Sequence, residues 1–164
     1  MKNDLKNTTF IVPLRIDTGD RLRNVILSTS YLLHHFDTTV MIKEVDSERR
    51  FESFALPIIE RLVDTSNLVH IFEEDTRTDD AFHRTKVLND MVMESTTDIV
   101  VNYDTDLILP PSSYINAVQM LKREYDVVYP FKEVVYPHKW FGPNNANKST
   151  VDLFPKSWRM IDEK

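Results

Sequence analysis

The stretch IVVNYDTDLILP, from Ile99 to Pro110, decides how the rest of the chain is interpreted. It begins as an apolar run of the kind found in buried strands of parallel sheets, and polar residues follow from Asn102 onward. Asp104 and Asp106 then stand two positions apart. In an extended segment both carboxylates face one spot past the strand end, where a hard cation such as Mg²⁺ or Mn²⁺ can bind together with phosphates. The spacing therefore predicts a metal–diphosphate site, although an Asp-rich chain is expected to contain such a motif by chance as well.

Strand and helix patterns alternate along the chain. We expect strands at about 8–14, 38–45, 68–72, 99–101 and 126–129, and helices at about 18–35, 49–64, 81–95 and 110–123. Within the second helix Pro57 predicts a kink or a break, and Phe54 and Ile58 are expected to face inward. The alternation is typical of α/β proteins, so we predict a three-layer α/β/α sandwich with a mostly parallel, Rossmann-like central sheet.

The parallel sheet also predicts where a ligand binds. Right-handed crossovers bring the carboxyl ends of the strands, and the N-termini of the following helices, to one edge of the sheet, and open α/β sheets bind ligands there. The charged residues expected at this edge are Arg15, Asp17, Glu44, Asp46, Glu73, Glu74, Arg84, Asp104 and Asp106. Carboxylates suit a metal ion, and Arg15 and Arg84 suit phosphate oxygens, so the edge fits a nucleoside-diphosphate ligand.

Composition narrows the classes of function. The 164 residues, 41% hydrophobic and 28% charged, fit one domain with its own core. A net charge of −6 disfavours a nucleic-acid surface, and with only two glycines the chain has no glycine-rich phosphate loop. The absence of cysteine fits a reducing compartment. Because no signal-peptide pattern and no run of membrane-spanning length occurs, we expect a cytoplasmic protein without a membrane span.

Four segments, in this order, resemble the GT-A glycosyltransferases, especially their β-1,4-galactosyltransferase-like and family-2-like group. They are PLRID (Pro13–Asp17), IKEVD (Ile42–Asp46), FHRTKVLN (Phe82–Asn89) and NYDTDLILP (Asn102–Pro110). The most specific feature is FHRTKVLN followed by the D-x-D motif. The resemblance covers about residues 8–131 and implies that they form a nucleotide-sugar-binding core of GT-A type.

The resemblance implies two groups of nucleotide contacts near the start of the chain. Pro13, Leu14 and Arg15 would line the nucleotide site. Glu44 or Asp46 would lie near the base or the ribose. The implied donor is a UDP- or GDP-linked sugar, and the implied acceptor is a saccharide or glycoconjugate.

The resemblance also implies roles around the D-x-D motif. Arg84 would contact the diphosphate, and Thr105 would belong to the nucleotide-sugar site. Asp104 would face the ribose and a water molecule on the metal, whereas Asp106 would bind Mn²⁺ or Mg²⁺ directly. The metal would neutralise the diphosphate leaving group while the sugar moves to the acceptor.

The resemblance stops after Phe131. Residues 132–164 contain no acidic segment of the kind that supplies the catalytic base, so the catalytic residues stay unassigned and the activity of the isolated chain stays open. We expect them to form an irregular extension of a single domain, short of a full acceptor half. One alternative is a non-catalytic nucleotide-sugar-binding or assembly module of a larger glycosyltransferase. Another is a haloacid-dehalogenase-like phosphatase, although that class normally carries its D-x-D motif on the first strand.

Overall fold

The computed structural model describes residues 2–76, 81–123 and 125–131, so the expected extension at 132–164 lies outside the described residues. Contacts divide the chain after Pro111 into two compact units. The elements of the first unit are β1 (Asn3–Leu14), α1 (Gly19–His35), β2 (Phe36–Asp46), the π-helix η1 (Phe51–Ala55), α2 (Leu56–Leu62), β3 (Leu68–Glu74), α3 (Arg84–Glu94) and β4 (Ile99–Asn102). Helix α4 (Pro111–Leu121) begins at the boundary. Within the described part, no helix is both long and apolar enough to cross a membrane.

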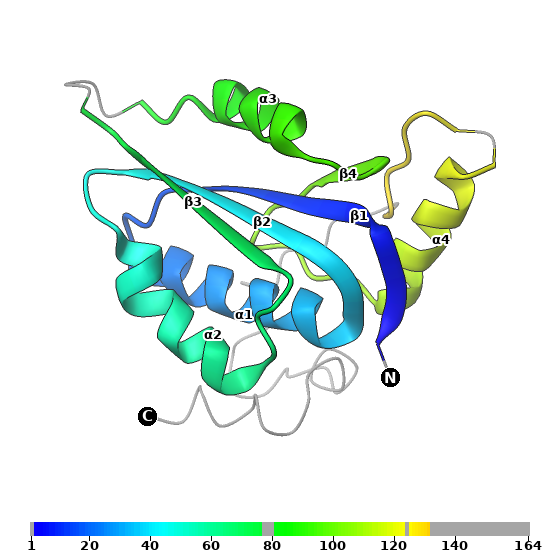
Figure 1. Cartoon of the computed structure of the whole chain (residues 1–164), viewed down its shortest axis with the longest axis horizontal. Helices are drawn as coiled ribbons and strands as arrows, with labels where there is room; N and C mark the ends of the chain where they lie inside the picture. The colour runs from blue at the N-terminus through cyan, green and yellow to red at the C-terminus, as the bar shows by residue number, and fades with distance from the viewer. Residues whose placement is uncertain (1, 77–80, 124, 132–164) are drawn as a thin grey trace, which may run out of the picture. The chain divides into compact units, whose positions relative to one another are not determined.

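The four strands form one parallel sheet in the order β3-β2-β1-β4. Helices α1 and α2 cover one face of the sheet, and α3 covers the other (Figure 1). This arrangement confirms the predicted α/β sandwich with a parallel, Rossmann-like sheet. The direction in which strands are added reverses between β1 and β4, and parallel sheets bind ligands at the carboxyl ends of the two strands that flank such a reversal.

The core lies on both faces of β1, which explains its unbroken apolar run. Phe10 is fully buried, with its ring stacked on Phe36 at 6.2 Å and meeting Tyr103 edge-on at 5.7 Å between centroids. The next residue, Ile11, faces the opposite side and packs against α3. Its cluster also contains Met41, Val45, Val87 and Met91. Helix α3 is thereby fixed on the sheet, and its first turn comes to the carboxyl edge.

The predicted fifth strand, Asp126–Tyr129, is wrong. Residues 125–131 contain no strand, and Val127 and Tyr129 are 71% and 79% exposed. The β-branched and aromatic residues of DVVY favour a strand, but a strand also needs a hydrogen-bonded neighbour, and the described sheet consists of β3, β2, β1 and β4.

The segment around Pro57 confirms one expectation and corrects another. The helix changes from the π-helical turn of η1 to α2 just before Pro57, which lies in the first turn of α2, where proline is tolerated. Phe54 and Ile58, expected to face inward, are instead 56% and 40% exposed. A π-helical turn closes over five residues, so it rotates the following side chains away from the 3.6-residue pattern on which the prediction was based.

We expect the end of α1 to make folding sensitive to pH, through His35. The Nε2 atom of His35 is buried with no hydrogen-bond partner among the described residues, and its ring lies 4.4 Å from that of Tyr31 between centroids. Burial, and then the charge of neighbouring His34, lower the pKa of His35 below its usual 6.5. The unfolded chain therefore binds this proton more readily than the folded chain, so stability should fall as the pH drops below about 6.5.

We expect urea unfolding at pH 7.5 and pH 5.5 to show this loss in the wild-type chain, at no more than about 1.4 kcal/mol per pH unit for one group. The His35→Gln variant should have a flatter profile, because it cannot take up the proton. His34→Gln removes only the secondary cause and should flatten the profile less. An unchanged slope in His35→Gln would show that another group controls the acid limb.

Candidate functional site

The D-x-D motif lies in a turn directly after β4. The Leu107 amide donates to the carbonyl of Asp104 at 3.1 Å, which closes a four-residue turn with Thr105 and Asp106 at its centre. The expected extended geometry is therefore corrected. The rule that side chains two apart point the same way applies to strands, and the strand ends before the motif begins.

Tyr103 anchors this turn to the sheet. Its amide donates to the carbonyl of Ile11 at 3.1 Å, and its hydroxyl donates to the carbonyl of Leu107 at 2.5 Å. The side chain is 3% exposed and packs on Phe10. The backbone that carries the two carboxylates is thus held at both ends, while both carboxylates stay exposed to solvent.

Arg84, the first residue of α3, lies against the turn. Its Nη2 atom forms an ion pair with Oδ1 of Asp104 and donates to Oδ1 of Asn102 at 3.3 Å. The Arg84 and Asp104 side chains are 43% and 52% exposed, so both can reach a ligand. The guanidinium predicted for phosphate and a carboxylate predicted for metal are therefore adjacent at the end of β4.

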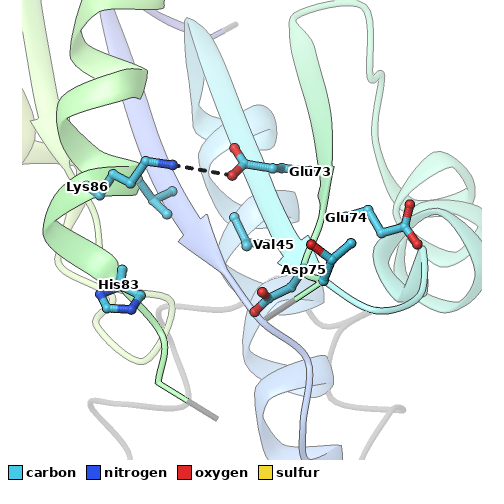
Figure 2. Close-up of a pocket in the computed structure, with 8 residues that line it drawn as sticks. Val45, Glu73, Glu74, Asp75, His83 and Lys86 are labelled. Atoms are coloured by element: carbon cyan, nitrogen blue, oxygen red, sulfur yellow. Dashed lines mark ion pairs between the residues drawn. The ribbon is translucent and has the colours of Figure 1, made fainter. Parts of the chain in front are cut away.

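A cavity of about 340 Å³ lies at the same edge, between the ends of β2 and β3 and the first turn of α3 (Figure 2). Its lining residues are Val45, Glu73, Glu74, Asp75, Thr76, His83, Lys86 and Val87. Figure 2 shows Lys86 reaching from α3 toward Glu73, with 3.6 Å between Nζ and Oε1, whereas the Glu74 carboxylate lies on the other side of β3. The volume is at the lower end of the ~300–1,000 Å³ typical of small-molecule sites.

Behind the Lys86–Glu73 pair, the buried Lys43 ties α3 to the sheet. Its Nζ lies 3.1 Å from Glu94, 3.5 Å from Glu73 and 3.7 Å from Asp90. Burial alone would lower the pKa of Lys43, but the hydrogen bond to Glu94 and the charges of these carboxylates outweigh it and raise the pKa. Lys43 therefore stays charged, and Glu73 keeps a cationic partner even when Lys86 moves.

Arg15 makes structural contacts in this structure. Its Nε donates to the carbonyl of Val45 at 3.2 Å, its Nη2 forms an ion pair with Asp75, and its guanidinium lies 5.6 Å from the centroid of Phe82. The sequence did not single out Asp75, because β3 extends past its predicted end at Phe72 to Glu74. These contacts join the ends of β1, β2 and β3 beside the cavity.

Glu44 and Asp46 were both candidates for the base or ribose, and the structure separates them. Glu44 is fully buried; its Oε1 accepts from the Phe51 amide at 2.7 Å, and its Oε2 lies 3.2 Å from Nε2 of His70. Asp46 ends β2, and its Oδ1 accepts from the Ser47 amide at 2.8 Å. Its Oδ2 is buried with no hydrogen-bond partner among the described residues. A buried acceptor without a donor is unusual, so Asp46 is the better candidate for a ligand contact.

The other residues predicted for the nucleotide site lie at the same edge. Pro13 and Leu14 end β1, and Leu14 is 3% exposed, so its side chain belongs to the core beneath the edge. Asp17 is exposed and forms an ion pair with Arg21 of α1 at 3.2 Å. The sequence identified the edge, but it did not identify Lys86, whose position in the cavity depends on how α3 packs on the sheet.

A metal ion at the D-x-D turn would need ligands beyond the protein. Among residues 2–76, 81–123 and 125–131, no group of three or more His, Asp or Glu side chains is placed to hold a metal ion. Mg²⁺ is commonly bound by one or two carboxylates together with substrate phosphates and water. Two exposed carboxylates on an anchored turn fit a cation of that kind, which completes its coordination with a diphosphate.

Comparisons of the chain with protein-family models, with curated proteins and with solved structures found no match. The candidate site is therefore defined by two features, the geometry of these residues and the sequence motifs. Both point to the carboxyl edge of the sheet in the first unit.

Proposed function

We propose that the chain is the nucleotide-sugar-binding part of a metal-dependent glycosyltransferase of GT-A type. The reaction would move a sugar from a UDP- or GDP-linked donor to a saccharide or glycoconjugate acceptor. The observation that carries the proposal is the adjacency of Arg84 and Asp104 at the reversal between β1 and β4. A guanidinium beside a carboxylate suits a ligand that carries both charges, as a metal-bound diphosphate does.

The start of α3 supports a phosphate at this position. The backbone amides of a first helical turn and the helix dipole favour an anion at that end. The side chain of the N-cap residue, His83, makes no capping hydrogen bond to this turn. Arg84 adds a planar donor that can hold two phosphate oxygens.

Asp46 and the cavity support a nucleoside at the same edge. A ribose hydroxyl or a base N–H would give the buried Oδ2 of Asp46 the donor that it lacks. The cavity between β2, β3 and α3 lies at the same edge, on the α3 face of the sheet, and Asp46 is not among its lining residues, so it would take a different part of the ligand. Glu44 has no part in this binding, because the Phe51 amide and His70 already engage its two oxygens.

In the proposed reaction the chain binds and orients the donor. A bound Mn²⁺ or Mg²⁺ would neutralise the charge that develops on the diphosphate as the sugar leaves. Arg84 would hold the phosphate oxygens by charge-assisted hydrogen bonds, and the turn anchored by Tyr103 would keep Asp104 and Asp106 in place. Deprotonation of the acceptor needs a base, and no residue of the described part is assigned to that task.

The two alternatives make different predictions for ligand binding. A non-catalytic module would bind nucleotide sugar with metal but would not consume it. A haloacid-dehalogenase-like phosphatase would use the first Asp of the motif as a nucleophile, and the position of the motif after β4 instead of the first strand argues against that class.

The test is a thermal-shift and calorimetry screen of UDP, GDP, ADP and inorganic phosphate, each with and without Mn²⁺. We expect UDP or GDP to stabilise the protein only with metal, and ADP and phosphate to have little effect. A nucleotide-sugar consumption assay then separates an enzyme from a binding module. Absence of metal-dependent UDP or GDP binding would contradict both the glycosyltransferase and the non-catalytic binding module.

Arg84→Ala should weaken metal–diphosphate binding more than Lys86→Ala does. A lost charge-assisted phosphate contact costs about 1.5–3 kcal/mol, and the lower part of that range applies because Arg84 is 43% exposed. Lys86 is 68% exposed and faces β3, away from the turn. Calorimetry with Mn²⁺ and the preferred nucleoside diphosphate measures the difference, and equal losses would place the diphosphate in the cavity beside Lys86.

A further inference from the structure

We infer that this site takes the metal and the diphosphate as one complex, and that the Arg84–Asp104 ion pair discriminates against either of them alone. The inference rests on the proposed function and concerns the form in which the donor binds. It makes one ion pair responsible for rejecting free metal and free nucleotide.

In the unliganded protein, Arg84 and Asp104 are already paired with each other. Arg84 contacts the carboxylate of Asp104 and also donates to Asn102 at 3.3 Å. The charges of Arg84 and Asp104 therefore screen each other before a ligand arrives. Because Asn102 is a second acceptor for Arg84, the guanidinium keeps a partner beside β4 when Asp104 leaves it.

Either ligand alone meets an unfavourable charge at this pair. A metal ion at Asp104 must displace the guanidinium and then lies beside an unpaired positive charge. A diphosphate at Arg84 must displace the carboxylate and then lies close to Asp104, with Asp106 in the same turn. Like charges at such distances repel, and the repulsion is only partly screened by solvent at a half-exposed site.

The complex of metal and diphosphate avoids this cost. The metal binds the carboxylate of Asp104 and the phosphates bind the guanidinium of Arg84. One ion pair is therefore replaced by two contacts, each between groups of opposite charge. The pair is broken once for both ligands, which makes their binding mutually favourable. Because both side chains are about half exposed, the pair itself should account for about a two- to five-fold change in affinity.

The test measures metal-free and metal-only binding in a double-mutant cycle of Arg84→Gln and Asp104→Asn. The probes are UDP, GDP and inorganic pyrophosphate without metal, and MnCl₂ without nucleotide. We expect Asp104→Asn to raise metal-free affinity for all three anions about two- to five-fold, because Arg84 is released. We expect Arg84→Gln to raise the affinity for Mn²⁺ alone, because Asp104 is released.

The double variant separates release of Arg84 from simple loss of negative charge. If the pair discriminates, Asp104→Asn should gain clearly less in an Arg84→Gln background than in the wild-type background, because only the relief of repulsion remains. Asp106→Asn is the matched control, since it removes the same charge from the same turn and leaves the pair intact; its gain should be smaller. Asp20→Asn breaks the exposed Arg23–Asp20 pair of α1 and should change nothing. Melting curves without ligand confirm that each variant is folded.

Two results would overturn the inference in distinguishable ways. If Asp104→Asn raises anion affinity equally with and without Arg84, repulsion between the anion and Asp104 alone is responsible. The proposed function then stands, but the ion pair does not discriminate. If the wild-type chain binds neither UDP nor GDP even with Mn²⁺, the proposed function fails and the inference fails with it.

Discussion

Asp106→Ala is expected to abolish the Mn²⁺-dependent part of UDP or GDP binding and to leave the melting temperature of the unliganded protein unchanged. The side chain is exposed, and the hydrogen bond that closes its turn joins the backbones of Asp104 and Leu107. The turn should therefore form without the carboxylate. Loss of even an outer-shell partner of a metal site costs about 10–100-fold in affinity, so loss of a direct ligand should cost at least about 100-fold.

Calorimetry with and without Mn²⁺ measures this effect in both variant and wild type. Asp98→Ala is the matched control, because Asp98 is an exposed carboxylate directly before β4, at the opposite end of that strand. It should leave binding unchanged. Equal nucleotide affinity in Asp106→Ala and wild type, both measured with Mn²⁺, would show that the metal does not bind at this turn.

Glu44→Ala is expected to destabilise the fold strongly, by about 2–4 kcal/mol. The substitution leaves the buried Phe51 amide without its acceptor at 2.7 Å and removes the contact of His70. It also opens a cavity where a fully buried side chain stood. Because the Phe51 amide begins η1, which leads into α2, the loss should loosen the connection between β2 and that helix.

Urea unfolding followed by circular dichroism measures the change. Glu44→Gln keeps an acceptor for the Phe51 amide and should lose less stability than Glu44→Ala. Glu52→Ala removes an exposed carboxylate of the same segment, paired with Arg49 at 3.3 Å, and should be nearly neutral. A Glu44→Gln variant with wild-type stability and much weaker nucleotide binding would instead assign Glu44 to the ligand.

The sequence was sufficient to predict which residues lie at the carboxyl edge of the sheet. Hydrophobic periodicity and the handedness of crossovers are properties of whole strands and helices, so they do not depend on the details of side-chain packing. The apolar run Phe10–Val12 needs burial on both faces, and this requires helices on each side of a parallel sheet, whereas Ile99–Val101 is only partly buried at the end of the described sheet. Parallel strands then place their following residues on one edge without any knowledge of side-chain packing. That rule places Arg84 and Asp104 on one edge, and their adjacency depends in addition on the packing of α3 against β1 and β2.

The role of each residue at this edge depends on where its strand ends, and hydrophobic periodicity predicts strand ends poorly. The second strand was expected to end at Val45, but β2 continues to Asp46, which leaves Glu44 inside the sheet and Asp46 at its end. At β3 the strand extends two residues past its predicted end, from Phe72 to Glu74, and this brings Asp75 to Arg15. At β4 the backbone turns at once, because Tyr103 binds both Ile11 and Leu107, and no local pattern in the sequence encodes those two partners.

Strand β4 is joined to the sheet through a short stretch of β1, Thr8–Ile11, which is far from it in sequence. Closing a long loop costs more chain entropy than closing a short one, and contacts between distant segments form slowly during folding. We therefore expect β1 and β2 to associate early and the turn after β4 to be ordered last. In the folded chain the same segment should exchange its amide hydrogens through local opening more readily than β1 and β2 do. A ligand that bridges Arg84 and the turn would hold this opening closed, so the donor would complete the fold of the edge that binds it.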